Sequence, residues 1–410
     1  MNAALSRIGG ASIAVLMLLG AGAAAEPITF DEALERAMRF NNGLIASRLT
    51  AESAGMAARQ AEAFPNPALA GRFENLGRNE LELALSQTIE LGGKRRARMD
   101  AARSEARSAG LAHGAAKLDL EAETMRRYAA AAAAERRIVL VDASIRLAAI
   151  ERDQIEIRVR AGAARESDLL QAEIAVEELR AERARLARDR GKAFLALSAL
   201  WGETDPESLT VAETFSEDAA VPPGDSLRRF AGGHPGALLL RERTSAAAAG
   251  LAVARAARMP DVEIGAGIVR YGETNDDQLI LSASIPLPLF NRNRAAIGER
   301  ERLAAASESA LRESLARREL DMRLVESDIA SAGEALSSLD AAIIPRARSA
   351  YEKFKMYYGT GAASFMEMNG ARRDLVALQL RRIEILYERA LAAADLIEIA
   401  GWRLPVFTER

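Results

Sequence analysis

The segment QLILSASIPLPLFNRNR, residues 278–294, is a short strand-like run set between two much longer helical patterns. Its apolar side chains occupy every second position, namely Leu279, Leu281, Ala283, Ile285, Leu287 and Leu289. Strict alternation predicts a β-strand with two unlike faces. Pro286 and Pro288 favour a strand end or edge, because proline lacks a ladder donor. A lone strand cannot satisfy its own backbone, so this segment predicts partner strands elsewhere in the chain.

Three other alternating runs can supply those partners. We predict strands at about 68–75, 81–91 and 261–271, with the opening segment forming a fourth at 278–289. Each run is about as long as a membrane-spanning β-strand, and each has one apolar face and one small or polar face. Side chains predicted to line a water-filled interior are Arg72, Glu74, Glu80, Glu82 and Glu263, and Phe73, Tyr271 and Phe290 suit an aromatic girdle.

Very long helices surround these strands. An amphipathic helix starts at Thr29 and is ended by Pro65, and a run of about 65 residues from about 95 to 161 predicts a helix of about 100 Å. The chain reverses at Gly162 and returns as a helix to about 200. A linker rich in proline and acidic residues occupies 203–225.

The same plan then repeats. A helix at 226–259 precedes the second strand pair, and a second helical hairpin spans about 295–400, bent by Pro345. Matching residues recur about 200 positions apart. The pairs are Pro65 with Pro260, Ser86 with Ser282, Ile89 with Ile285, Gly162 with Gly361, and Trp201 with Trp402. The sequence therefore predicts two structural repeats, 26–202 and 226–410.

Composition gives no support to several classes of function. Lysine and arginine number 55 against 58 aspartates and glutamates, so no basic excess indicates nucleic-acid binding. The chain has no cysteine and two histidines, which gives no basis for a metal site or a bound cofactor. Neither a catalytic constellation nor a glycine-rich phosphate loop is recognisable, so we expect a protein that is not an enzyme.

The first 25 residues have the pattern of a secretory signal peptide. Arg7 precedes the apolar run 13–19, and the alanines at 23–25 predict cleavage between Ala25 and Glu26. The alternative is an uncleaved anchor helix. Beyond Ala25 no run reaches the roughly 20 apolar residues of a membrane helix. We therefore expect an exported protein.

Four strands cannot close a barrel by themselves. Open strand edges are not tolerated in lipid, so a membrane sheet of this size needs further copies of the chain. Three copies would give twelve strands. The alternative is an ordinary soluble sheet packed on helices, which the signal peptide and the very long helices disfavour.

The chain resembles the TolC family of outer-membrane efflux proteins over essentially all of its mature length. FDEALERAMRFNN (30–42) is similar to the opening helix of that family, and IPLPLFNRNR (285–294) resembles its cation-efflux, CzcC-like branch. RVRAGAARESDLLQAE (158–173) and YYGTGAASFMEMNGARRDL (357–375) resemble the periplasmic helix tips.

The resemblance implies a mainly α protein with a membrane β part. It implies a homotrimeric, twelve-stranded barrel in the lipid of the outer membrane, continued by an α-helical periplasmic barrel. It also implies docking to a periplasmic adaptor and an inner-membrane pump, in a tripartite system that exports heavy-metal cations. Alternatives are an outer-membrane component of a type I secretion or multidrug efflux system, and, in another class, a periplasmic coiled-coil adaptor.

The resemblance also assigns roles at the tips. Ser167 and Asp168 fall where the first tip accepts inter-helix hydrogen bonds, Tyr358 where the second tip supplies one, and Glu367 where an acidic ring would attract cations. Each has a plainer interpretation: Asp168 as a helix N-terminal acid, Tyr358 as packing, Glu367 as a solvated helix face.

The resemblance also implies where an adaptor would contact the tips. These positions are Gly162 and Ala163 at the first reversal, and Gly361 and Ala362 at the second. Two positions differ from some family members: Ala363 replaces a basic partner, and Gly370 replaces a second acidic residue. Met356, Met366 and Met368 also cluster near the second tip and suggest soft-metal contacts, although methionine commonly fills gaps in cores.

Overall fold

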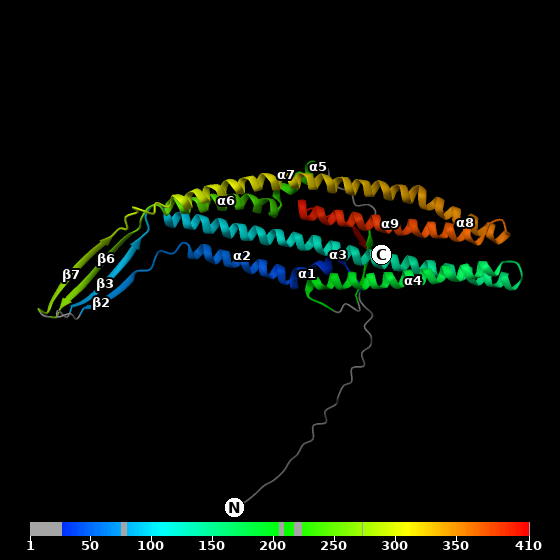
Figure 1. Ribbon diagram of the computed structural model, residues 1–410, viewed down its shortest axis with the longest axis horizontal. Coiled ribbons are helices and arrows are strands. Elements are labelled where there is room, and N and C mark those ends of the chain that lie inside the picture. The colour runs from blue at the N-terminus through cyan, green and yellow to red at the C-terminus, as the bar shows by residue number, and fades with distance from the viewer. Residues whose placement is uncertain (1–26, 75–79, 205–208, 217–223, 273, 410) are drawn as a thin grey trace, which may run out of the picture.

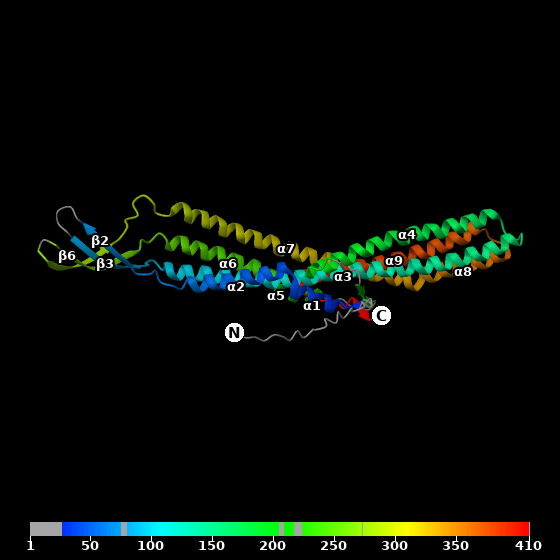
Figure 2. The same cartoon turned by 90° about the horizontal axis from the view of Figure 1, so that it is seen from below.

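The computed structural model describes residues 27–74, 80–204, 209–216, 224–272 and 274–409. The predicted cleavage site at Ala25 and Glu26 lies outside this part of the chain. The molecule is a long rod, with a β-sheet at one end, two helix reversals at the other, and the C-terminus near the middle (Figures 1 and 2).

The two halves of the chain contain the same elements in the same order. The first half has α1 (Phe30–Phe40), α2 (Asn42–Gln60), β2 (Ala68–Glu74), β3 (Glu80–Ile89), α3 (Lys94–Arg160) and α4 (Glu166–Ser198), followed by a 3-10 turn (Ala199–Trp201). The second half has α5 (Gly224–Gly233), α6 (Pro235–Ala256), β6 (Val262–Tyr271), β7 (Asp276–Ser284), α7 (Arg294–Ser338), α8 (Ile344–Thr360) and α9 (Phe365–Ala400).

The long strands form one antiparallel sheet in the order β2-β3-β6-β7. The register places Leu83 opposite Ile268 and Ile268 opposite Leu279, so the apolar side chains of all four strands lie on one continuous face. The opposite face carries Glu82, which pairs with Arg72 on β2. The alternation in the sequence therefore predicted the two faces correctly.

The opening segment is a shorter strand than predicted. β7 ends at Ser284 rather than at 289, and it begins at Asp276, inside what was predicted as a turn. The backbone leaves the ladder just before Pro286 and Pro288, because neither residue can donate a ladder hydrogen bond. Apolar alternation continues past the true end of the strand, which is why the pattern overestimated its length.

Each predicted opening helix is in fact two helices. Asn41 separates α1 from α2 and caps α2 by accepting a hydrogen bond from the Leu44 amide at 3.0 Å. His234 separates α5 from α6 and accepts from the Gly236 amide at 3.0 Å. Both side chains offer the backbone an alternative partner, which stops one helix and starts the next.

The long helix α3 has 67 residues and runs beside α2 and α6 near the sheet and beside α4 and α9 beyond the middle (Figure 1). Among the described residues, none of the helices is both long and apolar enough to pass through a bilayer. The matching long helix of the second half is interrupted by a π-helical turn, Leu339–Ile343, directly before Pro345. A wider turn accommodates the missing proline amide, and it falls where the sequence predicts a bend.

The segment predicted as a linker, 203–225, contributes to the core at the middle of the rod. β4 (Thr210–Val211) pairs with β1 (Pro27–Ile28), and β5 (Glu213–Phe215) pairs with β8 (Phe407–Glu409). The Tyr128 ring of α3 packs against Phe407 at 4.8 Å between centroids. The two ends of the described chain and the linker therefore meet on α3 at one aromatic cluster.

Candidate functional site: the paired helix tips

Both helix reversals are closed by the same set of hydrogen bonds. At the first, the Ala163 amide donates to Arg158 O (2.7 Å) and the Gly162 amide to Val159 O (2.9 Å). At the second, the Ala362 amide donates to Tyr357 O (2.8 Å) and the Gly361 amide to Tyr358 O (3.2 Å). This is the Schellman arrangement, and it needs a left-handed residue, which Gly162 (φ 70°) and Gly361 (φ 79°) provide.

The four proposed adaptor-contact residues, Gly162, Ala163, Gly361 and Ala362, are all exposed at the end of the rod opposite the sheet. A Cβ added at either glycine would meet no atom within 4 Å. Both glycines are therefore required by backbone conformation, and the surface around them remains free.

Asp168 and Glu367 occupy the same position of the repeat but have different surroundings. Glu367 closes a capping box with Ser364, which caps α9: its carboxylate accepts from the Ser364 amide and hydroxyl, both at 2.8 Å. These bonds to Ser364 hold the pKa of Glu367 below its usual value. In α4 the capping position is Arg165, which makes no side-chain cap. Asp168 therefore takes no part in a capping box, and its side chain is half-buried.

Tyr358 is buried in the small core that joins the two hairpins at their tips. Its ring packs against Phe365, and the Arg158 guanidinium lies 5.0 Å from the ring centre while donating to Tyr358 O at 3.0 Å. Burial, with the nearby charge of Asp168, raises the pKa of Tyr358, and Arg158 opposes the rise. Within the described part of the chain the Tyr358 hydroxyl is buried without a hydrogen-bond partner.

The structure therefore brings Asp168 and Tyr358 near one another, whereas Ser167 is exposed on the first turn of α4. Glu367 is also exposed, and it is engaged by Ser364. At the two differing positions, the Ala363 amide bonds to Tyr357 O, and Gly370 has open space where a Cβ would lie. The three methionines do not form one cluster: Met368 is buried in the tip core, and Met356 and Met366 are exposed.

A buried polar triad lies deeper between the hairpins, and the sequence did not reveal it. Glu151 of α3 forms an ion pair with Arg372 of α9 (3.5 Å), and both side chains are only 5% exposed. The Tyr351 hydroxyl of α8 donates to the same carboxylate. Burial, followed by this contact, raises the pKa of Tyr351. The three residues are 21 to 221 positions apart, so only the packing of the two hairpins in space brings them together.

No group of three or more histidine, cysteine or acidic side chains in the described residues is arranged to hold a metal ion. The tips instead offer two superposable helix reversals, a buried tyrosine and a nearby carboxylate.

Comparison with known proteins agrees with this architecture. Residues 37–203 and 240–402 match the family described as "Outer membrane efflux protein". The cobalt-zinc-cadmium resistance protein CzcC of Cupriavidus metallidurans is 26% identical over 384 residues, covering 92% of this chain and 91% of that protein. The nickel-cobalt-cadmium resistance protein NccC of Alcaligenes xylosoxydans xylosoxydans is 27% identical over 305 residues, covering 72% and 69%.

Solved structures share the fold. A crystal structure of CusC superposes with a TM-score of 0.79 at 19% identity, over 90% of this chain and 91% of that one. The outer membrane protein VceC from Vibrio cholerae superposes with a TM-score of 0.77 at 19% identity, over 91% and 96%. The family match covers both repeats and decides between a channel and a periplasmic adaptor. The chain belongs to the outer membrane efflux protein family, as an outer-membrane channel with a long periplasmic helical part.

Proposed function

We propose that this chain is the passive exit duct of a tripartite system that exports heavy-metal cations across the outer membrane. The observation that carries the proposal is the match over most of the chain to relatives named for resistance to cobalt, zinc, cadmium and nickel.

The proposed assembly is a homotrimer with a twelve-stranded barrel. β2 and β7 are the outer strands of the sheet, and each has one edge that pairs with no other strand in the described part of the chain. Lipid cannot solvate open edges, so β7 of one copy would pair with β2 of the next until the barrel closes. The unequal faces support this assembly, since the apolar face would meet lipid and the face with Arg72 and Glu82 would meet water.

The proposed gate lies at the tips. In the proposed gate the Tyr358 hydroxyl, which has no hydrogen-bond partner among the described residues, donates to Asp168 within one protomer or across two, and Ser167 lies beside Asp168 in the sequence. The hydrogen bond accepted by Asp168, and a second one accepted by Ser167, would hold the tips closed when no adaptor is bound. Glu367, repeated by symmetry, would form an acidic ring that favours cations, while its bonds to Ser364 fix its orientation.

Opening requires a partner that contacts the tips. We propose that a periplasmic adaptor binds at Gly162, Ala163, Gly361 and Ala362, and links the duct to an inner-membrane pump. The exposed surfaces around both glycines support a docking role, because a Cβ added at either glycine would meet no atom within 4 Å.

Deletion of the gene in its native host tests the proposed substrate. Growth should become sensitive to cobalt, zinc, cadmium or nickel salts and should recover when the intact protein is supplied. Unchanged tolerance to all four metals, together with sensitivity to drugs or loss of a secreted protein, would instead assign the duct to a multidrug or type I secretion system.

A further inference from the structure

The loop between β7 and α7, residues 285–293, has a defined shape although it is neither strand nor helix. We call it the junction loop. The Leu289 amide donates to Leu287 O (2.9 Å), and the Asn291 side chain accepts from the Asn293 amide (3.0 Å). Asn293, in the left-handed region at φ 56°, donates its side-chain amide to Ala254 O of α6 at 2.7 Å. Both asparagines are thus used in building the turn into α7.

The apolar side chains of the junction loop project away from the protein. Phe290 is 100% exposed, Leu287 74% and Leu289 64%. They continue the apolar face of the sheet, whose β7 residues Leu279 and Leu281 are 73% and 76% exposed. A contiguous apolar surface of this kind marks a contact with membrane or protein. Since family membership places the sheet in the outer membrane, the loop lies at the periplasmic boundary of the bilayer.

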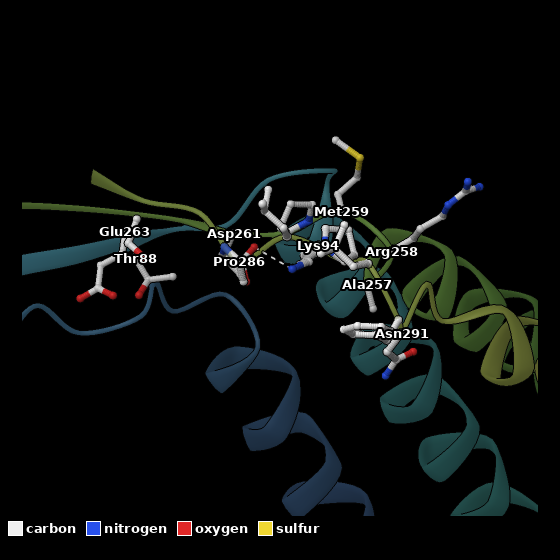
Figure 3. Close-up of a pocket in the computed structure, with 15 residues that line it drawn as sticks. Thr88, Lys94, Ala257, Arg258, Met259, Asp261, Glu263, Pro286 and Asn291 are labelled. Atoms are coloured by element: carbon white, nitrogen blue, oxygen red, sulfur yellow. Dashed lines mark hydrogen bonds and ion pairs between the residues drawn. The ribbon is translucent and has the colours of Figure 1, made fainter. Parts of the chain in front are cut away.

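Three exposed arginines lie in or near this apolar loop. Arg292 and Arg294 flank Asn293 in the sequence, and Arg258, in the turn between α6 and β6, lines the same groove of about 600 Å³ as Leu287, Leu289 and Phe290 (Figure 3). All three are exposed, and no hydrogen bond or ion pair is found for their side chains in the part of the chain that the structure describes. By contrast, Lys94 on the same groove is paired with Asp261 at 2.8 Å.

We propose that the junction loop and these three arginines form a binding surface for phospholipids of the periplasmic leaflet. Phe290, Leu287 and Leu289 insert among the upper acyl carbons, and the guanidinium groups of Arg258, Arg292 and Arg294 bind lipid phosphates. Guanidinium pairs bidentately with phosphate, and apolar side chains beside free cations are typical of a segment that lies in a membrane interface. The proposal depends on the outer-membrane location and not on the exported substrate.

Site-directed labelling tests the position of the loop. The chain has no cysteine, so Phe290→Cys gives one labelled site in the full-length protein. Reference sites are Leu281→Cys on the apolar face and Met366→Cys at the tip, whose parent side chains are 76% and 69% exposed. The protein with a nitroxide label at each site is placed in phosphatidylcholine–phosphatidylglycerol vesicles, and electron paramagnetic resonance measures how strongly two reagents relax the label. Oxygen dissolves in the lipid and a nickel complex stays in the water, so their effects report whether the label lies in lipid or in water.

We expect the label at 290 to respond to oxygen more than the label at 366, and to nickel more than the label at 281. A label at 290 that behaves like the one at 366 would place the loop in water and overturn the proposal. A label shielded from both reagents would mean that a second protein copy covers the loop, and would overturn it as well.

The arginines are tested by lipid retention. Native mass spectrometry measures the phosphatidylglycerol that the detergent-purified protein retains in competition with phosphatidylcholine. The triple variant R258Q/R292Q/R294Q should bind phosphatidylglycerol roughly a hundredfold more weakly, at about a factor of five for each arginine. The matched control R346Q/R348Q/R373Q removes three exposed arginines near the tip and should keep wild-type retention. Equal retention in both triples, or equal loss, contradicts a phosphate site at the junction.

Discussion

At the residue scale, the stability of the buried triad of Glu151, Arg372 and Tyr351 depends on all three side chains. Glu151 and Arg372 share a site almost without water, and Tyr351 adds a hydrogen bond to the same carboxylate. Charges in such a site are stable only while they are paired, so the three side chains hold α3, α8 and α9 in one relative position.

Removing one member should therefore be costly. Glu151→Ala leaves the Arg372 guanidinium buried without its counter-charge and should lower the free energy of unfolding by about 3–5 kcal/mol. The exposed pair Glu177–Arg180 provides the control, because its side chains are 67% and 57% exposed and Glu177→Ala should cost less than about 1 kcal/mol. Thermal denaturation followed by circular dichroism compares the two. Equal midpoints would mean that the triad does not stabilise the tip.

Sequence reasoning reached the tip residues only in part. The spacing around Gly162 and Gly361 located both reversals, because a Schellman turn needs a left-handed residue at one fixed place. It missed the capping box of Ser364 and Glu367, although Ser-x-x-Glu before a helix is a sequence signal for one, and Arg165 offers no such signal before Asp168. It missed Glu151 and Arg372 because a partner on another hairpin leaves no local pattern.

At the element scale, the joins between strand and helix decide how the two repeats fit together. The turn at Gly92 and Gly93 enters α3, and both residues have positive φ, 69° and 73°. A Cβ on Gly92 would lie 2.5 Å from the Met259 Cβ of the other repeat, whereas one on Gly93 would meet nothing within 4 Å. Gly92 is therefore needed for the close contact between the repeats as well as for its positive φ, whereas Gly93 is needed only for its positive φ.

Alanine at these two positions separates the two effects. Gly93→Ala should cost about 1–2 kcal/mol, the usual penalty for a left-handed alanine. Gly92→Ala has the same penalty and must also displace Met259, so its thermal midpoint should fall further. Met259→Gly removes the Cβ that the Gly92→Ala side chain would meet, so it should recover part of the loss in the double variant. If the two single variants melt alike, the contact between the repeats is not tight.

His234 predicts that the stability of the folded protein depends on pH. Its Nδ1 accepts from the Gly236 amide and lies 2.9 Å from Arg318 Nη2, so the ring must be neutral to cap α6. Burial, with the charge of Arg318, lowers the pKa of His234 to about 4. The unfolded chain binds the proton near pH 6.5, so stability is full above that pH and falls as the pH drops from about 6.5 towards 4.

His234→Asn isolates this contribution, since asparagine caps a helix without titrating in that range. The wild type should lose on the order of 3 kcal/mol relative to the variant between pH 7 and pH 4, measured by unfolding at each pH. Parallel stability curves for the two proteins would show that His234 is not held neutral.

The elements themselves were predictable where the pattern is periodic. Alternation fixed both faces of β3 and β6, and unbroken helical composition fixed the length of α3. The ends of the strands were less predictable. The apolar alternation continues after Ser284, but the backbone there no longer pairs with the sheet because Pro286 and Pro288 cannot donate ladder hydrogen bonds. The breaks at Asn41 and His234 were missed because a single capping side chain is a weak signal within a long helical composition.

At the scale of the whole molecule, the proposal that three copies close one barrel predicts the mass of the assembly. Purified protein in detergent should have about three times the mass of one mature chain by native mass spectrometry, since three copies of the four-stranded sheet give the proposed twelve-stranded barrel. Deleting β7 should abolish this species, because one edge of every junction is then lost. A stable monomer or dimer in the wild type would contradict closure by three copies.

The account rests on a channel in the outer membrane that is closed at its periplasmic tips, and single-channel conductance in planar lipid bilayers tests it most directly. The wild type should pass a small current, and the double variant Asp168→Ala, Tyr358→Phe should raise the conductance severalfold, while Glu177→Ala on the exposed face of α4 leaves it unchanged. Wild-type conductance in the double variant would contradict the gate, and no conductance in any of the three proteins would contradict the channel itself.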